Sequence, residues 1–286
     1  MSRNDKKDLN FMPLSLTRPI EDLRCGVVTI GEKKRNHPIE YIWDLIKHLK
    51  EDLAEDIRDG KMERWGDGKR PIVKAVCHPS VVILNQEEVV LEEGVEIEPC
   101  AVLDARQGPI YIGQGTIIKA HANLRGPLYI GPGCRIGGEV SHSIFHGYSN
   151  KAHYGFIGHS YIGEWVNLGA GTTNSNLKNT YGTVKVQIGK KEIDTGLQFC
   201  GCFIGDHAKT GIGTLITTGA IIGVAANVFG GGVTKKVVKS FSWGANKKYD
   251  LEKALATMKL VMKRRGKVFS AAQEKQIRHL YENTIS

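Results

Sequence analysis

The stretch from residue 150 to residue 176 holds the densest set of side chains able to do chemistry. It contains Lys151, His153, Asn167, Asn174 and Asn176. The imidazole of histidine changes charge near neutral pH, so it can accept a proton from a reacting group. Lysine can bind an anion, and asparagine amides can hold polar groups by hydrogen bonds. The set predicts one wall of an active site.

The residues around this stretch show a six-residue aliphatic repeat. No helix keeps a period of six over more than a hundred residues, whereas a short strand followed by a tight corner does. Three such units close one triangular coil, so the pattern predicts a mainly β fold, a left-handed parallel β-helix of hexapeptide repeats, with about seven coils. The aliphatic residues are Leu91, Ile97 and Leu103, then Ile112, Ile118, Leu124, Ile130 and Ile136, then Ile157, Ile162 and Leu168, and finally Ile204, Ile216, Ile222 and Val228.

The chain divides into three expected regions. Residues 1–75 form an N-terminal segment with an amphipathic helix at 37–60, and 76–240 form the β-helix. The repeat breaks at 177–199, where alternating valines and a Gly-Lys-Lys turn predict an extruded hairpin with a functional role, folded either over the site or over a neighbouring subunit. Residues 241–286 read as a helical pair, with Ser270 and Gln273 as a capping box. The terminal helices are expected to cap the open ends of the β-helix.

Composition limits the classes of function. The net charge of +9 lies entirely in residues 235–286, where thirteen Lys and Arg against four Asp and Glu give 13 − 4 = +9. The positive and negative charges of residues 1–234 balance, which argues against nucleic-acid binding. The basic tail suits a phosphate-bearing ligand or serves solubility alone. The six cysteines show no paired spacing and are expected to be reduced. The polar N-terminus and the lack of a long apolar run predict a cytoplasmic protein that does not bind membranes.

Two sets of motifs carry a resemblance to known proteins. The stretch KAHYGFIGHSYIGEWVNLGAGTTNSN, from Lys151 to Asn176, resembles the acetyltransferase domain of the bacterial bifunctional enzyme that makes UDP-N-acetylglucosamine, one of the trimeric hexapeptide acyltransferases. Asn123 to Gly126 resembles the segment whose arginine binds phosphate in that family.

Longer similarity extends over most of the chain. The segments LTRP at 16–19, LRCG at 23–26, GYSNKAH at 147–153, NSNLKNTYG at 174–182, GLQFCG at 196–201 and SFSWG at 240–244 look like the sugar-phosphate nucleotidyltransferase family related to that bifunctional enzyme. Only about 75 residues precede the repeat, too few for a doubly wound nucleotide-binding domain, and they contain no glycine-rich phosphate loop. Nucleotidyl transfer is therefore not expected of this chain alone.

The resemblance implies a homotrimer that transfers an acyl group, most simply acetyl from acetyl-CoA, to an amino-sugar phosphate or nucleotide sugar in cell-envelope sugar metabolism. It implies His153 as general base. It implies no tightly bound cofactor and no metal. The acceptor would contact Arg125, Lys151, Asn167, Asn174 and Asn176, and the phosphates of acyl-CoA would contact Lys235, Lys236 and Lys239, unless these lysines are a solvated charge run.

Departures from the family pattern leave alternatives open. Phe156 stands where the acetyltransferases have a tyrosine, and Ser141 and His142 replace a lysine pair near Glu139. One alternative is therefore a non-catalytic trimeric module that binds a nucleotide sugar or a separate nucleotidyltransferase. A metal-dependent hydratase on the same fold is a further alternative, and it needs three converging histidines. Its candidates are His121, His142, His146, His153, His159 and His207.

Overall fold

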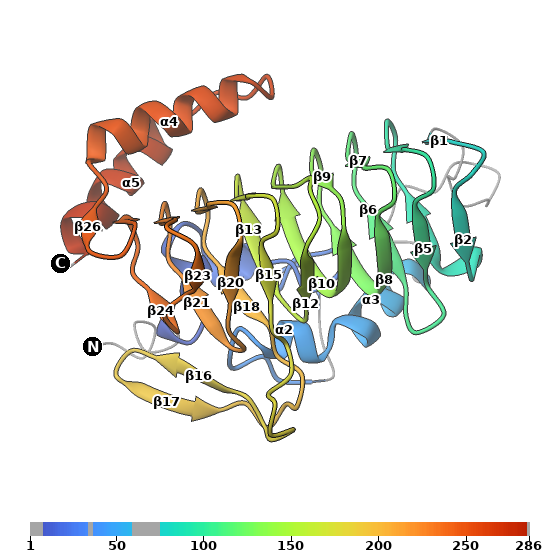
Figure 1. Ribbon diagram of the computed structural model, residues 1–286, viewed down its shortest axis with the longest axis horizontal. Helices are drawn as coiled ribbons and strands as arrows, with labels where there is room; N and C mark the ends of the chain where they lie inside the picture. Colours follow the sequence, from blue (N-terminus) through green and yellow to red (C-terminus); the bar gives the residue numbers. More distant parts are fainter. Residues whose placement is uncertain (1–7, 34–36, 59–74, 285–286) are drawn as a thin grey trace.

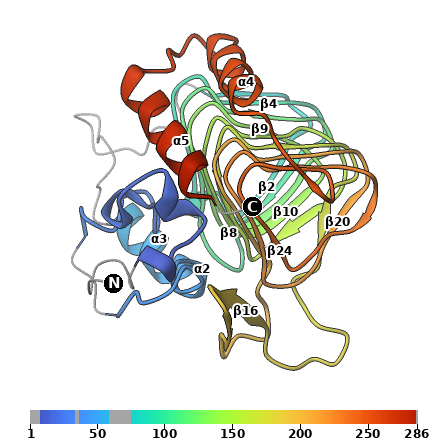
Figure 2. The same ribbon diagram turned by 90° about the vertical axis from the view of Figure 1, so that its left-hand side faces the viewer.

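The computed structural model describes residues 8–33, 37–58 and 75–284. Most of them wind into a parallel solenoid of triangular coils (Figures 1 and 2). The predicted left-handed parallel β-helix is confirmed, but it has about nine turns where about seven were predicted. The difference arises at the two ends, because the first coil at Val76 and the last at Trp243 lie outside the regular aliphatic repeat.

The strands form three sheets and one hairpin. The first sheet consists of β1 (Val76–Cys77), β4 (Glu96–Ile97), β7 (Ile117–Ile118), β9 (Arg135–Ile136), β11 (Asn150–Lys151), β14 (Asn167–Leu168), β19 (Lys209–Thr210), β22 (Asn227–Val228), β25 (Ser242–Trp243) and the antiparallel β26 (Lys247–Lys248). The second consists of β2 (Val82–Leu84), β3 (Val89–Leu91), β5 (Val102–Asp104), β6 (Ile110–Ile112), β8 (Asn123–Ile130), β10 (Glu139–Gly147), β12 (Phe156–Gly158), β13 (Tyr161–Glu164), β18 (Cys202–Ile204), β21 (Ala220–Ile222) and β24 (Val237–Val238). The third consists of β15 (Thr173–Asn174), β20 (Thr214–Ile216) and β23 (Gly232–Val233). The hairpin pairs β16 (Lys185–Ile188) with β17 (Lys191–Asp194).

The axis of the β-helix is filled by the aliphatic residues of the repeat. Ile112, Ile130, Ile136 and Ile162 are fully buried, and in the next coil Ile112 stacks on Ile130 and Ile162 stacks on Ile204. Burying one such side chain stabilises the fold by about 1.5–3 kcal/mol, so the stack is the main source of stability along the axis. Gly131 shows how tightly the corners are packed, because a Cβ there would lie 2.1 Å from the carbonyl oxygen of His146.

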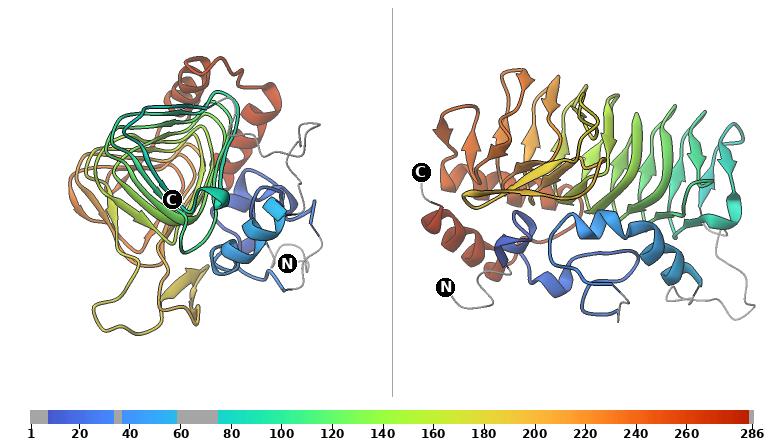
Figure 3. Two further views of the ribbon diagram at one scale, coloured as in Figure 1. Left: turned by 90° about the vertical axis from the view of Figure 1, so that its right-hand side faces the viewer. Right: turned by 90° about the horizontal axis from the view of Figure 1, so that it is seen from below.

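The N-terminal segment lies along one side of the β-helix (Figure 3). Its helices are α2 (Asp44–Lys47) and α3 (Leu49–Arg58), with short 3-10 turns at Leu14–Leu16 and Ile20–Asp22, and a third such turn at Gln86–Glu88 joins β2 to β3. Leu23, Leu45 and Leu49 pack with Tyr161 and Phe203 of the second sheet. The prediction that this segment caps an open end is therefore wrong. Its apolar face covers a side of the sheet because that side is itself apolar and aromatic.

The hairpin β16–β17 joins the same hydrophobic cluster. Val184 and Val186 are fully buried against the N-terminal segment and the second sheet. The extruded segment thus folds back on the side of the β-helix that the N-terminal segment covers (Figure 2).

The C-terminal helices α4 (Leu251–Lys263) and α5 (Ala271–Asn283) pack on the last coils through Phe241, Leu255 and Ile277. The capping box at the start of α5 is present, with both Ser270–Gln273 hydrogen bonds formed. No helix among the described residues has the length and apolar character required to cross a bilayer.

Candidate functional site

His153 lies at the corner between β11 and β12, and its side chain is exposed to solvent. Tyr154, the next residue, is also exposed, whereas Gly155 turns the chain back with φ of +119° and leaves no room for a Cβ beside the carbonyl oxygen of Thr172. The imidazole is therefore presented outward on a corner whose backbone is tightly constrained. Such a position lets a ligand reach it from solvent.

Lys151 occupies an inward position of the repeat, in register with Ile136 of the preceding coil. Its side chain is buried, and Nζ donates hydrogen bonds to the carbonyl oxygens of Gly137 (2.7 Å) and His153 (2.8 Å). Burial lowers the pKa of Lys151 to about 8, against an opposing effect of Glu139. The ammonium thus fixes the backbone of the corner that presents His153. The sequence itself indicated the inward position of Lys151, because this residue lies six positions before Ile157 in the repeat.

Replacing Lys151 by methionine is expected to change the pH dependence of stability. Because the folded-state pKa of about 8 lies below the ordinary 10.5, the unfolded chain binds more protons between these values. The wild type should therefore gain stability relative to Lys151→Met as pH rises from 8 to 10.5, by roughly 2–3 kcal/mol at 1.36 kcal/mol per pKa unit. Urea unfolding of both proteins at pH 7.5, 9 and 10.5 measures this. A difference that stays constant across the range would contradict it.

Asn167 lies on β14 with its side chain exposed on the outer face of the first sheet. Its amide oxygen lies 3.4 Å from Nδ2 of Asn150, the residue opposite it on β11. Asn150 in turn accepts a hydrogen bond of 2.7 Å from Nη2 of Arg265, which lies two residues beyond the end of α4. The structure thus places Asn167 one coil beyond His153 and links it to the C-terminal helices. Arg265 is a contact that the sequence reasoning missed.

The other two asparagines lie closer to the backbone. Asn174 is buried at an inward position in register with Ile216, and its amide bonds both to N–H (2.8 Å) and to the carbonyl oxygen (3.0 Å) of Gly158. Asn176 is half-buried, with Nδ2 2.9 Å from Nδ1 of His159. Asn174 also follows Leu168 by six residues, so its inward position was readable from the repeat.

Arg125 lies on β8 of the second sheet, whereas Asn167 lies on β14 of the first sheet. Its guanidinium is half-exposed and pairs with the carboxylate of Glu139 at 3.3 Å. Glu139 is in register with Phe156 on the next coil. The charge of Arg125 is therefore partly offset before any ligand binds.

The predicted coenzyme-binding lysines lie at the far end of the β-helix. Lys235 and Lys239 line a pocket of about 500 Å³ that is bounded by Phe229, Phe241 and the turn before α4. Lys236 is half-buried and donates to the carbonyl oxygen of Thr218, and burial lowers its pKa. Two of the three lysines thus share one concave surface, and the third is held by the backbone.

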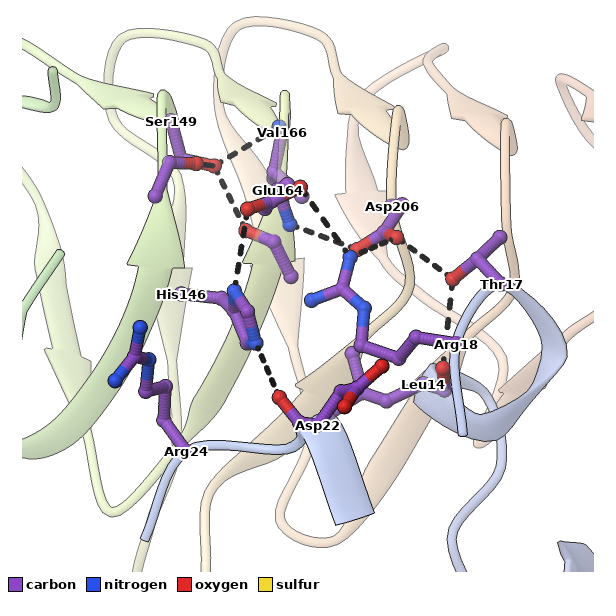
Figure 4. A network of polar contacts seen from close by, with 12 residues as sticks. Leu14, Thr17, Arg18, Asp22, Arg24, His146, Ser149, Glu164, Val166 and Asp206 are labelled. Carbon is purple, nitrogen blue, oxygen red and sulfur yellow. Dashed lines mark hydrogen bonds and ion pairs between the residues drawn. The ribbon is translucent and has the colours of Figure 1, made fainter. Parts of the chain in front are cut away.

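A buried ionic network joins the N-terminal segment to the coils (Figure 4). Arg18 pairs with Asp206 and reaches Glu164 at 3.5 Å, while the hydroxyl of Thr17 donates to Asp206 at 2.6 Å. His146 Nδ1 lies 3.3 Å from Glu164. Burial alone would raise the pKa of Asp206, but Arg18 and Thr17 outweigh it and lower the pKa.

The network borders a polar cavity of about 250 Å³ that is also lined by Phe269, which precedes α5, and by Gln276 of α5. Sequence reasoning noted the LTRP segment only as part of a resemblance. The partners of Arg18 lie 146 and 188 residues away, so no local pattern could reveal them. Among the described residues, no three His, Cys, Asp or Glu side chains are grouped so that they could hold a metal ion.

Comparisons with known proteins cover part of the chain. No protein-family model matches it. A Sulfurisphaera tokodaii protein named bifunctional sugar-1-phosphate nucleotidylyltransferase/acetyltransferase is 39% identical over 100 residues, which are 35% of this chain and 25% of that protein. A Methanococcus aeolicus protein named bifunctional protein GlmU is 30% identical over 184 residues, 63% of this chain and 40% of that one. The chain spans less than half the length of either relative.

Solved structures with a similar arrangement share little sequence. AntD, an N-acyltransferase from Bacillus cereus solved with dTDP and 3-hydroxybutyryl-CoA, is 11% identical with a TM-score of 0.32, over 67% of this chain and 88% of AntD. UDP-N-acetylglucosamine acyltransferase from Campylobacter jejuni is 14% identical with a TM-score of 0.23, over 73% and 97%. Values this low carry no information about the chemistry of this chain. What the sequence comparisons do show is that the C-terminal part of the chain is homologous to part of the bifunctional sugar-1-phosphate nucleotidylyltransferase/acetyltransferases, as its motifs predicted.

Proposed function

We propose that this protein transfers an acyl group from acyl-CoA, most simply acetyl-CoA, to the amino group of a sugar phosphate or nucleotide sugar. The observation that carries the proposal is the exposed imidazole of His153 on a corner fixed by Lys151, with the exposed amide of Asn167 one coil away. The names of the relatives, which include an acetyltransferase, support the same reaction class.

His153 is the base in this reaction. The amine of the acceptor attacks the thioester carbonyl and its proton passes to His153 as the C–N bond forms. The C–S bond then breaks, and the leaving sulfur takes that proton from His153, so that CoA leaves as the free thiol. Asn167 and Asn176 hold the acceptor by hydrogen bonds, and Arg125 binds its phosphate in competition with Glu139. Asn174 and Lys151 act through the backbone, because both side chains are buried and already hydrogen-bonded.

The acyl-CoA binds toward the C-terminal coils in this proposal. The end pocket offers Lys235 and Lys239 to the phosphates, with Phe229 as an apolar wall. Lys236 would add its charge only after releasing Thr218. The side of the β-helix near this pocket exposes large apolar residues, and their exposure supports association of copies into the proposed homotrimer: Ile212, Leu215, Phe229 and Val233.

The decisive experiment follows free thiol released from acetyl-CoA. The purified protein is incubated with a panel of amino-sugar phosphates and amino-sugar nucleotides, and thiol is measured against a control without acceptor. Acceptor-dependent release supports the proposal. Background release with every acceptor contradicts it. A nucleotide sugar that raises the melting temperature without thiol release favours the non-catalytic module instead, for which Phe156 and the engaged Lys151 are the supporting observations.

A further inference from the structure

Cationic side chains gather on the outer face of the first sheet, beside the proposed site. Arg135 projects from β9, Arg265 follows the last residue of α4 by two positions, and Lys267 lies 5.4 Å above the ring of Tyr148. We call Arg135, Arg265 and Lys267 the basic cluster. Its members come from segments about 130 residues apart in the sequence, which only the docking of α4 brings together.

The two guanidiniums of the cluster are held by neutral acceptors. Arg265 donates to the carbonyl oxygen of Gly133 (3.2 Å) and to the amide oxygen of Asn150 (2.7 Å). Arg135 donates to the carbonyl oxygens of Cys134 (3.0 Å) and Gly115 (3.3 Å). Within the described ranges no carboxylate forms an ion pair with either of them. Burial and the neighbouring charges of Arg135 and Arg264 lower the pKa of Arg265, as expected where positive charge accumulates.

This arrangement contrasts with that of three other arginines, each of which pairs with a carboxylate. Arg18 pairs with Asp206, Arg106 with Asp104, and Arg125 with Glu139. Two half-buried guanidiniums that lie close together without an acid repel one another, and an anion placed between them removes that repulsion. Each keeps N–H donors free, in the planar fork that matches phosphate oxygens.

The position of the cluster relates it to the proposed acceptor site. Outward residues on successive strands of the first sheet run Arg135, Asn150, Asn167, Lys209 and Asn227, at about 4.8 Å per step. Asn150 belongs to the coil of His153 and accepts from Arg265. The end pocket with its lysines lies in the opposite direction along the axis, past Asn227.

We propose that the basic cluster binds the diphosphate of a nucleoside-diphosphate sugar, so that the acceptor is a nucleotide sugar and not a sugar monophosphate. Two guanidiniums from different elements can each grip one phosphate, which a diphosphate supplies and a monophosphate does not. In this binding mode the basic cluster takes the phosphates that were assigned above to Arg125, which lies on β8 of the second sheet, and the sugar extends over Asn167 toward His153. The identification of this ligand as the acceptor rests on the proposed function, whereas the binding of a nucleoside diphosphate at the cluster does not.

The test measures binding by titration calorimetry, with UDP and GDP as probes because the cluster contacts only their diphosphate. Arg265→Gln and Arg135→Gln should each weaken the binding of both nucleotides at least tenfold. Arg265→Lys should lose less, because it keeps the charge. Lys263→Gln is the matched control at the same helix end, with the same change of net charge, and should stay within twofold of wild type. Melting temperatures show whether the Arg265 variants keep the helices docked, and Arg135→Gln leaves α4 itself unchanged.

Three outcomes would overturn the inference. The first is that the wild type binds neither nucleotide. The second is that Arg265→Gln and Arg135→Gln bind the nucleotides as tightly as Lys263→Gln does. The third is that both arginine variants weaken the binding of CoA more than that of UDP, which would assign the cluster to the acyl donor. The binding assay needs no turnover. If the wild type binds UDP but releases no thiol, the proposed reaction is rejected and the nucleotide site at the basic cluster is retained. If the wild type releases thiol but Arg265→Gln does not weaken UDP binding, the nucleotide site is rejected and the proposed reaction is retained.

Discussion

His153→Ala is expected to lower kcat/KM for acyl transfer by about 10²–10⁴-fold, the usual contribution of a positioned general base. The side chain is exposed and makes no structural contact that would explain such a loss. The corner itself is fixed by Lys151, which bonds to the backbone carbonyl of His153 and not to the ring. The melting temperature should therefore stay close to that of the wild type, and thiol release from acetyl-CoA measures the change in rate.

A second corner histidine provides the control for this prediction. His121 is also exposed and follows a strand of the first sheet, two coils earlier. It has a φ of +60°, so asparagine, which tolerates that conformation, is the suitable replacement. His121→Asn should keep the full rate. Equal rates for His153→Ala and His121→Asn would remove the general base from the proposal.

Arg18→Leu is expected to have the largest effect on stability, lowering the free energy of unfolding by about 3–5 kcal/mol. The substitution leaves the carboxylate of Asp206 buried without its cation, with only Thr17 and the N–H of Glu164 as donors. It also removes the main polar link between the N-terminal segment and the coils. Urea unfolding at pH 7 measures the loss, and Arg18→Leu combined with Asp206→Leu should recover part of it.

The stability that the Arg18–Asp206 pair contributes depends on pH. Because the folded-state pKa of Asp206 lies below its ordinary value, the pair contributes its stability above about pH 4 and loses it as pH falls through the lowered pKa. The difference between wild type and Arg18→Leu should therefore shrink in acid. Arg106→Leu is the matched control, since Arg106 pairs with Asp104 in solvent and should leave the melting temperature unchanged. A difference that is independent of pH would show that lost packing, not the ion pair, causes the effect.

The repeat alone predicted the architecture because each inward position must be filled. Ile130 and Ile136 have no other place for their side chains, so a six-residue spacing leaves few alternatives to triangular coils. The same rule also predicts the burial of polar residues that occupy inward positions. Lys151 and Asn174 lie on the repeat, at positions where aliphatic residues face inward, and both proved to be buried. A polar residue at such a position has to find backbone partners, as these two do.

Contacts between distant segments could not be predicted in this way. Arg18 meets Asp206, and Arg265 meets Asn150, through the docking of helices and turns whose faces are set by tertiary packing. The side of the β-helix that receives the N-terminal segment was likewise hidden, because the aromatic residues Tyr161 and Phe203 lie beside the repeat positions and follow no regular spacing. The sequence therefore predicted what each coil contains, and the structure was needed to show what lies on its outer faces.

The β-helix also fixes distances along its axis by the number of its coils. Asn167 and Lys209 are 42 residues apart in the sequence, yet they are neighbours on adjacent strands, because the hairpin between them leaves the coil and returns to it without adding a step. The separation between the coil of His153 and the end pocket is thus fixed by the number of coils and is independent of loop length. Insertions or deletions within 177–199 can change what covers the side of the β-helix that the N-terminal segment also covers, while that spacing stays the same.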